Sequence, residues 1–112
     1  MLGETVGSSN ISASGYLITR TRAQLNGGVT TTTTEYPETV ITHIHLISSS
    51  TASNLTVSNG SGGTVWINIT GVVSKGTDFD FGMWGISFPL GAYVTVDGNI
   101  VTATFTYKAN KA

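Results

Sequence analysis

The sequence predicts an all-β protein, an antiparallel β-sandwich of the jelly-roll-like kind with about seven or eight short strands. Strand-favouring Thr, Val, Ile and aromatic residues are abundant, and clusters of Gly, Ser and Asn separate them. No window of about 11 or more residues shows helical periodicity. Several segments alternate between apolar and polar residues, so each strand has an apolar face to bury against a second layer.

The chain has 112 residues, a length typical of one small domain. Its start, residues 1–14, is rich in Gly and Ser, and we expect a flexible N-terminal arm that a neighbouring subunit could order. Residues 15–112 are expected to form a single β-sandwich domain. Only 10% of residues are charged, against about 25% in an average domain. The surface is therefore expected to be polar but weakly charged, which favours a packed assembly.

Residues 16–25 are the first clear strand. One face is expected to carry Leu17, Thr19, Thr21, Ala23 and Leu25. The opposite face is expected to carry Ile18, Arg20, Arg22 and Gln24.

The next segment opens with a glycine turn at Gly27–Gly28 and continues with five threonines, residues 30–34. These threonines predict an exposed strand or an extended sheet edge. Pro37 indicates that the segment lies at an edge or leaves the sheet, because proline cannot donate a ladder hydrogen bond.

Residues 40–47 form an apolar run that predicts another strand. Val40, Thr42, Ile44 and Leu46 are expected on one face. Ile41, His43, His45 and Ile47 are expected on the other.

The segments 92–96 and 101–107 predict a terminal hairpin that turns within Asp97–Gly98–Asn99. With Gly98–Asn99 as a two-residue loop, Val94 faces Ala103 and the apolar faces of both strands coincide.

His43 and His45 are candidate ligands for a metal ion. Alternate strand residues point to the same side, about 6–7 Å apart, so two imidazoles there could share an ion if a third ligand completed the shell. No Glu follows them, the chain has no third His, and the acidic residues are expected in loops or turns. We therefore assign no metal and no cofactor. Two half-buried histidines on a sheet face, or a site shared between subunits at a symmetry axis, are the alternatives.

Other chemistry is weakly indicated. Asp78 and Asp80 could share a strand face and bind calcium, although a solvated face is the simpler interpretation. No Gly-x-Ser-x-Gly motif stands in the chain and there is no cysteine, so no catalytic residue is assigned and we expect no enzyme. The five basic residues are scattered, which argues against nucleic acid. No signal peptide or membrane-spanning run is apparent.

The C-terminal half carries a recurring pattern: a Gly-Gly turn, a hydrophobic strand, a Gly-Ile-x-Phe-x-x-Gly-x-Tyr-Val run and a closing aromatic hairpin. This pattern, over about residues 60–107, resembles small β-sandwich virion proteins of tailed bacteriophages, especially capsid decoration or cement proteins. The matching residues are Gly85, Ile86, Phe88, Gly91, Tyr93, Val94, Phe105 and Tyr107.

The resemblance implies a trimer that binds the major capsid protein or other virion proteins. It implies a location on the phage capsid surface after synthesis in the host cytoplasm, with no nucleic acid, membrane or cofactor involved. The expected interface residues are Thr30, Thr32, Thr34, Tyr36, Trp84 and Phe88. Tail or head-fibre proteins share this pattern, so a carbohydrate- or receptor-binding module is the alternative. In that case Tyr36, Trp66, Trp84 and Tyr93 would be the candidate sugar-stacking residues.

Overall fold

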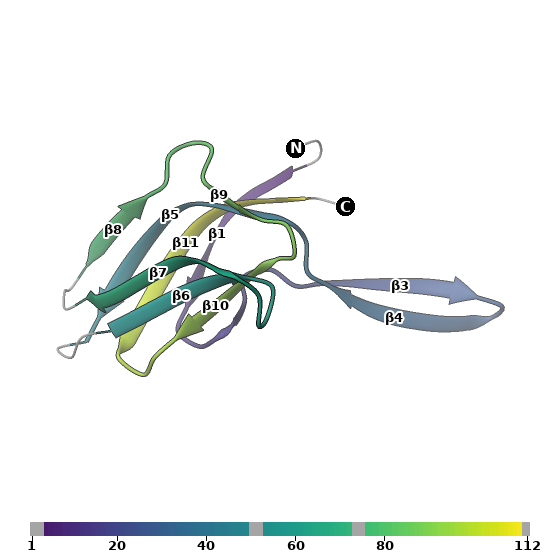
Figure 1. Ribbon diagram of the computed structural model, residues 1–112. Coiled ribbons are helices and arrows are strands. Elements are labelled where there is room, and N and C mark those ends of the chain that lie inside the picture. The colour runs from purple at the N-terminus through teal and green to yellow at the C-terminus, as the bar shows by residue number, and fades with distance from the viewer. Residues whose placement is uncertain (1–3, 50–52, 73–75, 111–112) are drawn as a thin grey trace.

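The computed structural model describes residues 4–49, 53–72 and 76–110, and this part of the chain contains strands and no helix (Figure 1). The strands are β1 (Glu4–Ile11), β2 (Gly15–Tyr16), β3 (Arg20–Asn26), β4 (Val29–Glu35), β5 (Thr39–Ser48), β6 (Ser53–Asn59), β7 (Val65–Val72), β8 (Thr77–Asp80), β9 (Ile86–Phe88), β10 (Ala92–Val96) and β11 (Ile100–Asn110). The described residues thus hold eleven strands, more than the sequence predicts. The very short β2 and β9 account for part of the excess, because they offer too few residues for alternation to be recognised.

Two sheets and a separate hairpin make up the molecule. The first sheet has the order β1-β11-β5-β8, with β9 also paired to β5. The second sheet has the order β2-β10-β6-β7, and β3 and β4 pair only with each other. All the pairings are antiparallel. The two sheets face each other and the hairpin extends from one side (Figure 1). The all-β antiparallel sandwich is confirmed, and the jelly-roll connectivity stays a prediction.

The core lies between the two sheets. The first sheet contributes Ile44, Leu46 and Phe105, and the second contributes Leu55, Val57 and Val94, all with no exposed surface. Burying each of the large side chains stabilises the fold by about 1.5–3 kcal/mol relative to leaving it exposed. The core therefore depends on the alternation that the sequence displays.

A β-bulge in β5 changes which face of that strand is buried. Ile41 pairs with Tyr107 and His43 pairs with Thr106, so Thr42 is an extra residue on β5. Ile41 consequently points into the core together with Ile44, whereas strict alternation predicted it on the histidine face. The Thr42 hydroxyl donates to the Thr106 carbonyl oxygen at 3.2 Å, which satisfies the irregular backbone.

The predicted pairing of β10 with β11 is wrong. β10 pairs with β2 and β6 in the second sheet, and β11 pairs with β1 and β5 in the first. The Asp97–Asn99 turn therefore crosses between the sheets, and Asp97 Oδ1 accepts the Asn99 N–H at 3.0 Å. Two apolar faces that meet across a core produce the same sequence pattern as two that lie side by side, which is why alternation alone selected the wrong partner.

The start of the chain, expected as an arm over residues 1–14, is paired in the described part. Residues Glu4–Ile11 form β1, which runs along β11 from Asn110 to Ala103 at the edge of the first sheet. Gly7 makes room for the Tyr107 ring, since a Cβ there would come within 3.0 Å of the Tyr107 hydroxyl oxygen. Strand pairing is made by backbone hydrogen bonds, which do not require apolar side chains, so the polar segment Glu4–Ile11 can pair with β11. Within the described residues no helix is present that is long and apolar enough to cross a membrane.

Candidate interaction surface

The β3–β4 hairpin projects away from the sandwich (Figure 1). The molecule measures 56 × 28 × 22 Å with a radius of gyration of 15.5 Å, whereas about 13 Å is expected for a compact domain of this length. The strands are joined by Gly27 and Gly28, whose φ angles of 60° and 83° suit the type I′ turn favoured by two-residue hairpins. Every side chain from Thr21 to Thr34 is exposed. The sequence prediction of an exposed threonine strand after a glycine turn is confirmed.

The hairpin has two chemically different faces, because paired residues share a side of a sheet. One face holds the charged groups Arg20, Arg22 and Glu35, and Arg22 Nε lies 3.3 Å from Glu35 Oε1. The other face is uncharged and consists of Thr21, Ala23, Leu25, Thr30, Thr32 and Thr34. The three threonines expected at an interface all lie on this uncharged face. The strand expected over residues 16–25 is divided into β2 and β3. Its apolar face, expected to be buried, is exposed in β3, where Leu25 is 76% exposed near the tip.

An aromatic cluster holds the base of the hairpin to the sandwich. The rings of Tyr16 and Tyr36 stack with centroids 3.6 Å apart, and Tyr93 meets Tyr16 edge-on at 5.0 Å. Gly91 lies beneath the stack with φ 91°, and a Cβ there would come within 2.9 Å of Tyr36 Cβ. Tyr36 therefore anchors the hairpin, and part of its ring remains open to solvent.

The other two expected interface residues differ completely in burial. Trp84 is 86% exposed in the turn between β8 and β9, so its side chain is accessible to a partner. Lys108 Nζ donates to the carbonyl oxygen of the adjacent Met83 at 3.2 Å, which ties the turn to β11. Phe88 has no exposed surface and packs in the core, so it is unavailable to a partner. A strand residue next to a turn looks the same in sequence whether it faces inward or outward.

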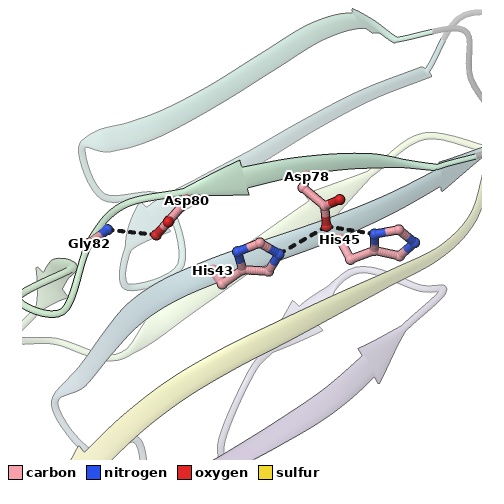
Figure 2. A network of polar contacts seen from close by, with 5 residues as sticks. All are labelled: His43, His45, Asp78, Asp80 and Gly82. Carbon is pink, nitrogen blue, oxygen red and sulfur yellow. Dashed lines mark hydrogen bonds and ion pairs between the residues drawn. The ribbon is translucent and has the colours of Figure 1, made fainter.

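His43 and His45 share one carboxylate oxygen on the outer face of the first sheet. Figure 2 shows Asp78 of β8 between the two imidazole rings of β5. Asp78 Oδ1 lies 3.0 Å from His43 Nε2 and 2.7 Å from His45 Nδ1, so both rings donate to it. Hydrogen bonds from His45 and then from His43 lower the pKa of the Asp78 carboxyl group below its ordinary value. Both imidazoles are half-buried, whereas the Asp78 side chain is 64% exposed.

The histidine pair is thus hydrogen-bonded across the sheet. Among residues 4–49, 53–72 and 76–110, no group of three or more His, Cys, Asp or Glu side chains is arranged to hold a metal ion. Asp78 lies in β8, so the strand face expected for Asp78 and Asp80 is confirmed and the loop or turn expected for the acidic residues is wrong here. The alternation of Asp78 and Asp80 around Phe79 was the signal for this strand. The link to the histidines was missed because the pairing of β8 with β5 is not visible in the sequence.

An apolar groove of about 450 Å³ runs between β7 and the β8–β9 region, and the sequence did not indicate it. The lining residues are Trp66, Ile67, Asn68, Ile69, Thr70, Phe79, Phe81 and Ile86. A bulge at Trp66, between the pairs Val57–Ile67 and Ser58–Val65, places its ring 5.6 Å from that of Phe88. The groove therefore follows the open edge of the sandwich, where the two sheets are not joined by a further strand within the described residues.

Comparisons with known proteins identify no relative. No family model matches the chain, and no curated protein or solved structure shows significant similarity to it.

Proposed function

We propose that this protein is a structural subunit of a virion, a trimeric capsid decoration or cement protein that binds neighbouring coat proteins on the surface of a bacteriophage head. The projecting β3–β4 hairpin is the observation that carries this proposal. Its fourteen consecutive exposed residues, Thr21 to Thr34, include the Gly27–Gly28 turn and support no core of their own. An isolated two-stranded hairpin is marginally stable in water, so a second surface is needed to order it fully.

The chemistry of the uncharged hairpin face supports a binding role. Threonine methyl groups, Ala23 and Leu25 bring apolar area with little desolvation cost from charges, and charged residues are depleted at the centre of protein interfaces. The exposed Met83 and Trp84 add a second apolar projection, and Trp is among the residues that contribute most to binding energy.

The experiment is to purify the native particles with which the protein associates and to image them. We expect the chain as an ordered trimer on the capsid surface, with the hairpin against a coat subunit. A variant in which residues 20–35 are replaced by a short Gly-Ser linker should fold and fail to occupy the particles. Occupancy equal to the wild type, or absence of the wild-type protein from all particles, would contradict the proposal.

A carbohydrate- or receptor-binding module is the second candidate, favoured by the exposure of Trp84. An exposed indole can stack on the apolar face of a sugar ring. On a glycan array this candidate predicts a specific signal that Trp84→Ala removes. A blank array, or a signal that survives the substitution, argues against it.

A further inference from the structure

Several strands of the described chain pair on one side only, and β3 and β8 are two of them. β3 pairs with β4 on one side only, and β8 pairs with β5 on one side only. The unpaired backbone N–H and C=O groups along such edges are a template for another strand. In Figure 1 the hairpin and β8 lie on opposite sides of the sandwich, so they cannot meet within one molecule.

The side chains along these two edges are complementary in sign and spacing. On β3, Arg20 and Arg22 point to the same side, and on β8 Asp78 and Asp80 point to the outer side of the sheet. In both strands the two charges are alternate residues, which places them about 6.6–7 Å apart. The faces opposite the charges are both apolar. Ala23 lies on the uncharged face of β3, and Phe79 of β8 lines the apolar groove.

We propose that β3 of one molecule adds to the free edge of β8 in a second copy of this chain and extends its first sheet. The added strand runs parallel to β8. The Phe81 N–H donates to the Thr42 carbonyl oxygen at 2.9 Å. In the β5–β8 register the backbone groups of Asp78 and Asp80 therefore point to the free edge.

In a parallel pair, a residue whose backbone points to the partner strand lies beside one whose backbone points away, and the two share a face. One placement therefore sets Arg20 and Arg22 beside Asp78 and Asp80 on the outer face. The same placement sets Thr21 and Ala23 over the groove beside Phe79.

The charged groups are available for this contact. Asp78 uses Oδ1 for both histidines, which leaves Oδ2 for an incoming guanidinium group. Asp80 accepts the Gly82 N–H through Oδ1 at 2.9 Å and is otherwise exposed. The Arg22–Glu35 pair is exposed, and an exposed ion pair contributes little to stability, so Arg22 can exchange partners at little cost.

The contact joins two different surfaces of the same chain, so it is head-to-tail and either closes into a ring or continues as a filament. A three-membered ring is the trimer of the proposed function. The inference thus rests on the self-association in that proposal, while capsid binding is tested separately on particles.

The backbone edge is tested with proline. The Gly27–Gly28 turn makes Asn26 and Val29 a hydrogen-bonded pair, and the pattern alternates along the hairpin. The N–H groups of Ala23 and Thr32 consequently point outward, from the β3 edge and the β4 edge respectively. Ala23→Pro removes the outward donor of β3 and Thr32→Pro removes that of β4, and neither breaks a bond within the hairpin.

The self-association of each full-length variant is measured by analytical sedimentation, after its circular dichroism spectrum has been shown to match that of the wild type. We expect Ala23→Pro to weaken self-association at least about tenfold, and Thr32→Pro to weaken it less than about threefold. Equal effects, or the reverse order, would overturn the inference.

The charges are tested by reversal. Arg20→Asp with Arg22→Asp should abolish self-association at low salt, as should Asp78→Arg with Asp80→Arg. The quadruple variant should recover it, because both surfaces are then reversed together. Failure of the quadruple variant to recover, or a wild-type chain that stays monomeric at every concentration, would overturn the inference. A chain that passes these tests yet is absent from particles retains the inference and loses the proposed function.

Discussion

The sandwich and the β3–β4 hairpin are both built from antiparallel strands, but they bury very different fractions of their side chains. In β5, alternate residues such as Ile44 and Leu46 are completely buried, whereas in the hairpin every residue from Thr21 to Thr34 is exposed. The sandwich is therefore stabilised by its own core. The hairpin is held by a type I′ turn at its tip and the Tyr16–Tyr36 stack at its base. The difference shows that regular β-structure forms a buried core in one region and an exposed, largely uncharged surface in the other.

The largest expected effect comes from opening a cavity in the sandwich. Phe105→Ala removes a completely buried ring from β11 and should lower the free energy of unfolding by about 3–5 kcal/mol. Leu25→Ala, the matched truncation on the hairpin, should change it by less than about 0.5 kcal/mol. Urea unfolding followed by circular dichroism measures both values. Similar losses for the two variants would erase the distinction between the regions.

A smaller effect is expected where the two regions meet. Gly91→Ala places a Cβ 3.3 Å from the Tyr16 ring as well as against Tyr36, at a φ that disfavours side chains. We expect a loss of about 1–3 kcal/mol in the free energy of unfolding and a loosened hairpin base. Gly98→Ala is the control, because no atom lies within 4 Å of its added Cβ. Thermal unfolding of both variants decides the matter, and an unaffected Gly91→Ala protein would show that the tyrosine stack is not tightly packed.

The smallest effect is expected at Asp78, on the outer face of the sandwich. Because its pKa is lower in the folded state, ionised Asp78 adds stability above the ordinary carboxyl pKa of about 3.9. That stability is lost as the pH falls through the lowered value. Asp78→Asn keeps an acceptor for the histidines but cannot titrate, so it should flatten the decline in unfolding free energy between pH 5 and pH 2. Identical pH profiles for wild type and variant would show that the histidine contacts do not act on this carboxylate in solution.

The face on which a side chain lies could be predicted from sequence wherever apolar and polar residues alternate regularly along a strand. The glycine turn and the exposed threonine strand are confirmed, and the alternation over residues 16–25 gives the two faces of β3 correctly. The pairing of β3 with β4 was not predicted, and residues 17–19 lie outside any strand. Strand alternation also placed His43 and His45 on one side of β5. These features depend on neighbours within a few residues of each other, so periodicity is sufficient to find them.

Features that depend on partners distant in sequence could not be predicted this way. The bulge at Thr42 shifts the inward face of β5 by one residue, and alternation carries no mark of an inserted residue. The apolar pattern of β10 and β11 is the same whether the two strands pair or face each other across the core. Their partners are decided by pairing with β2 and β6 in one sheet and with β1 and β5 in the other. The bond from both histidines to Asp78 and the groove at Trp66 likewise arise only when β8 joins β5.

The central claim is that the hairpin is dispensable for folding and necessary for association. The most direct measurement is made on a variant in which a short Gly-Ser linker replaces residues 20–35, with unfolding and sedimentation recorded on the same sample. We predict that the free energy of unfolding of the monomer changes by less than about 1 kcal/mol, while the self-association of the wild-type protein disappears. An unfolded variant, or a folded one that associates as the wild type does, would contradict the claim.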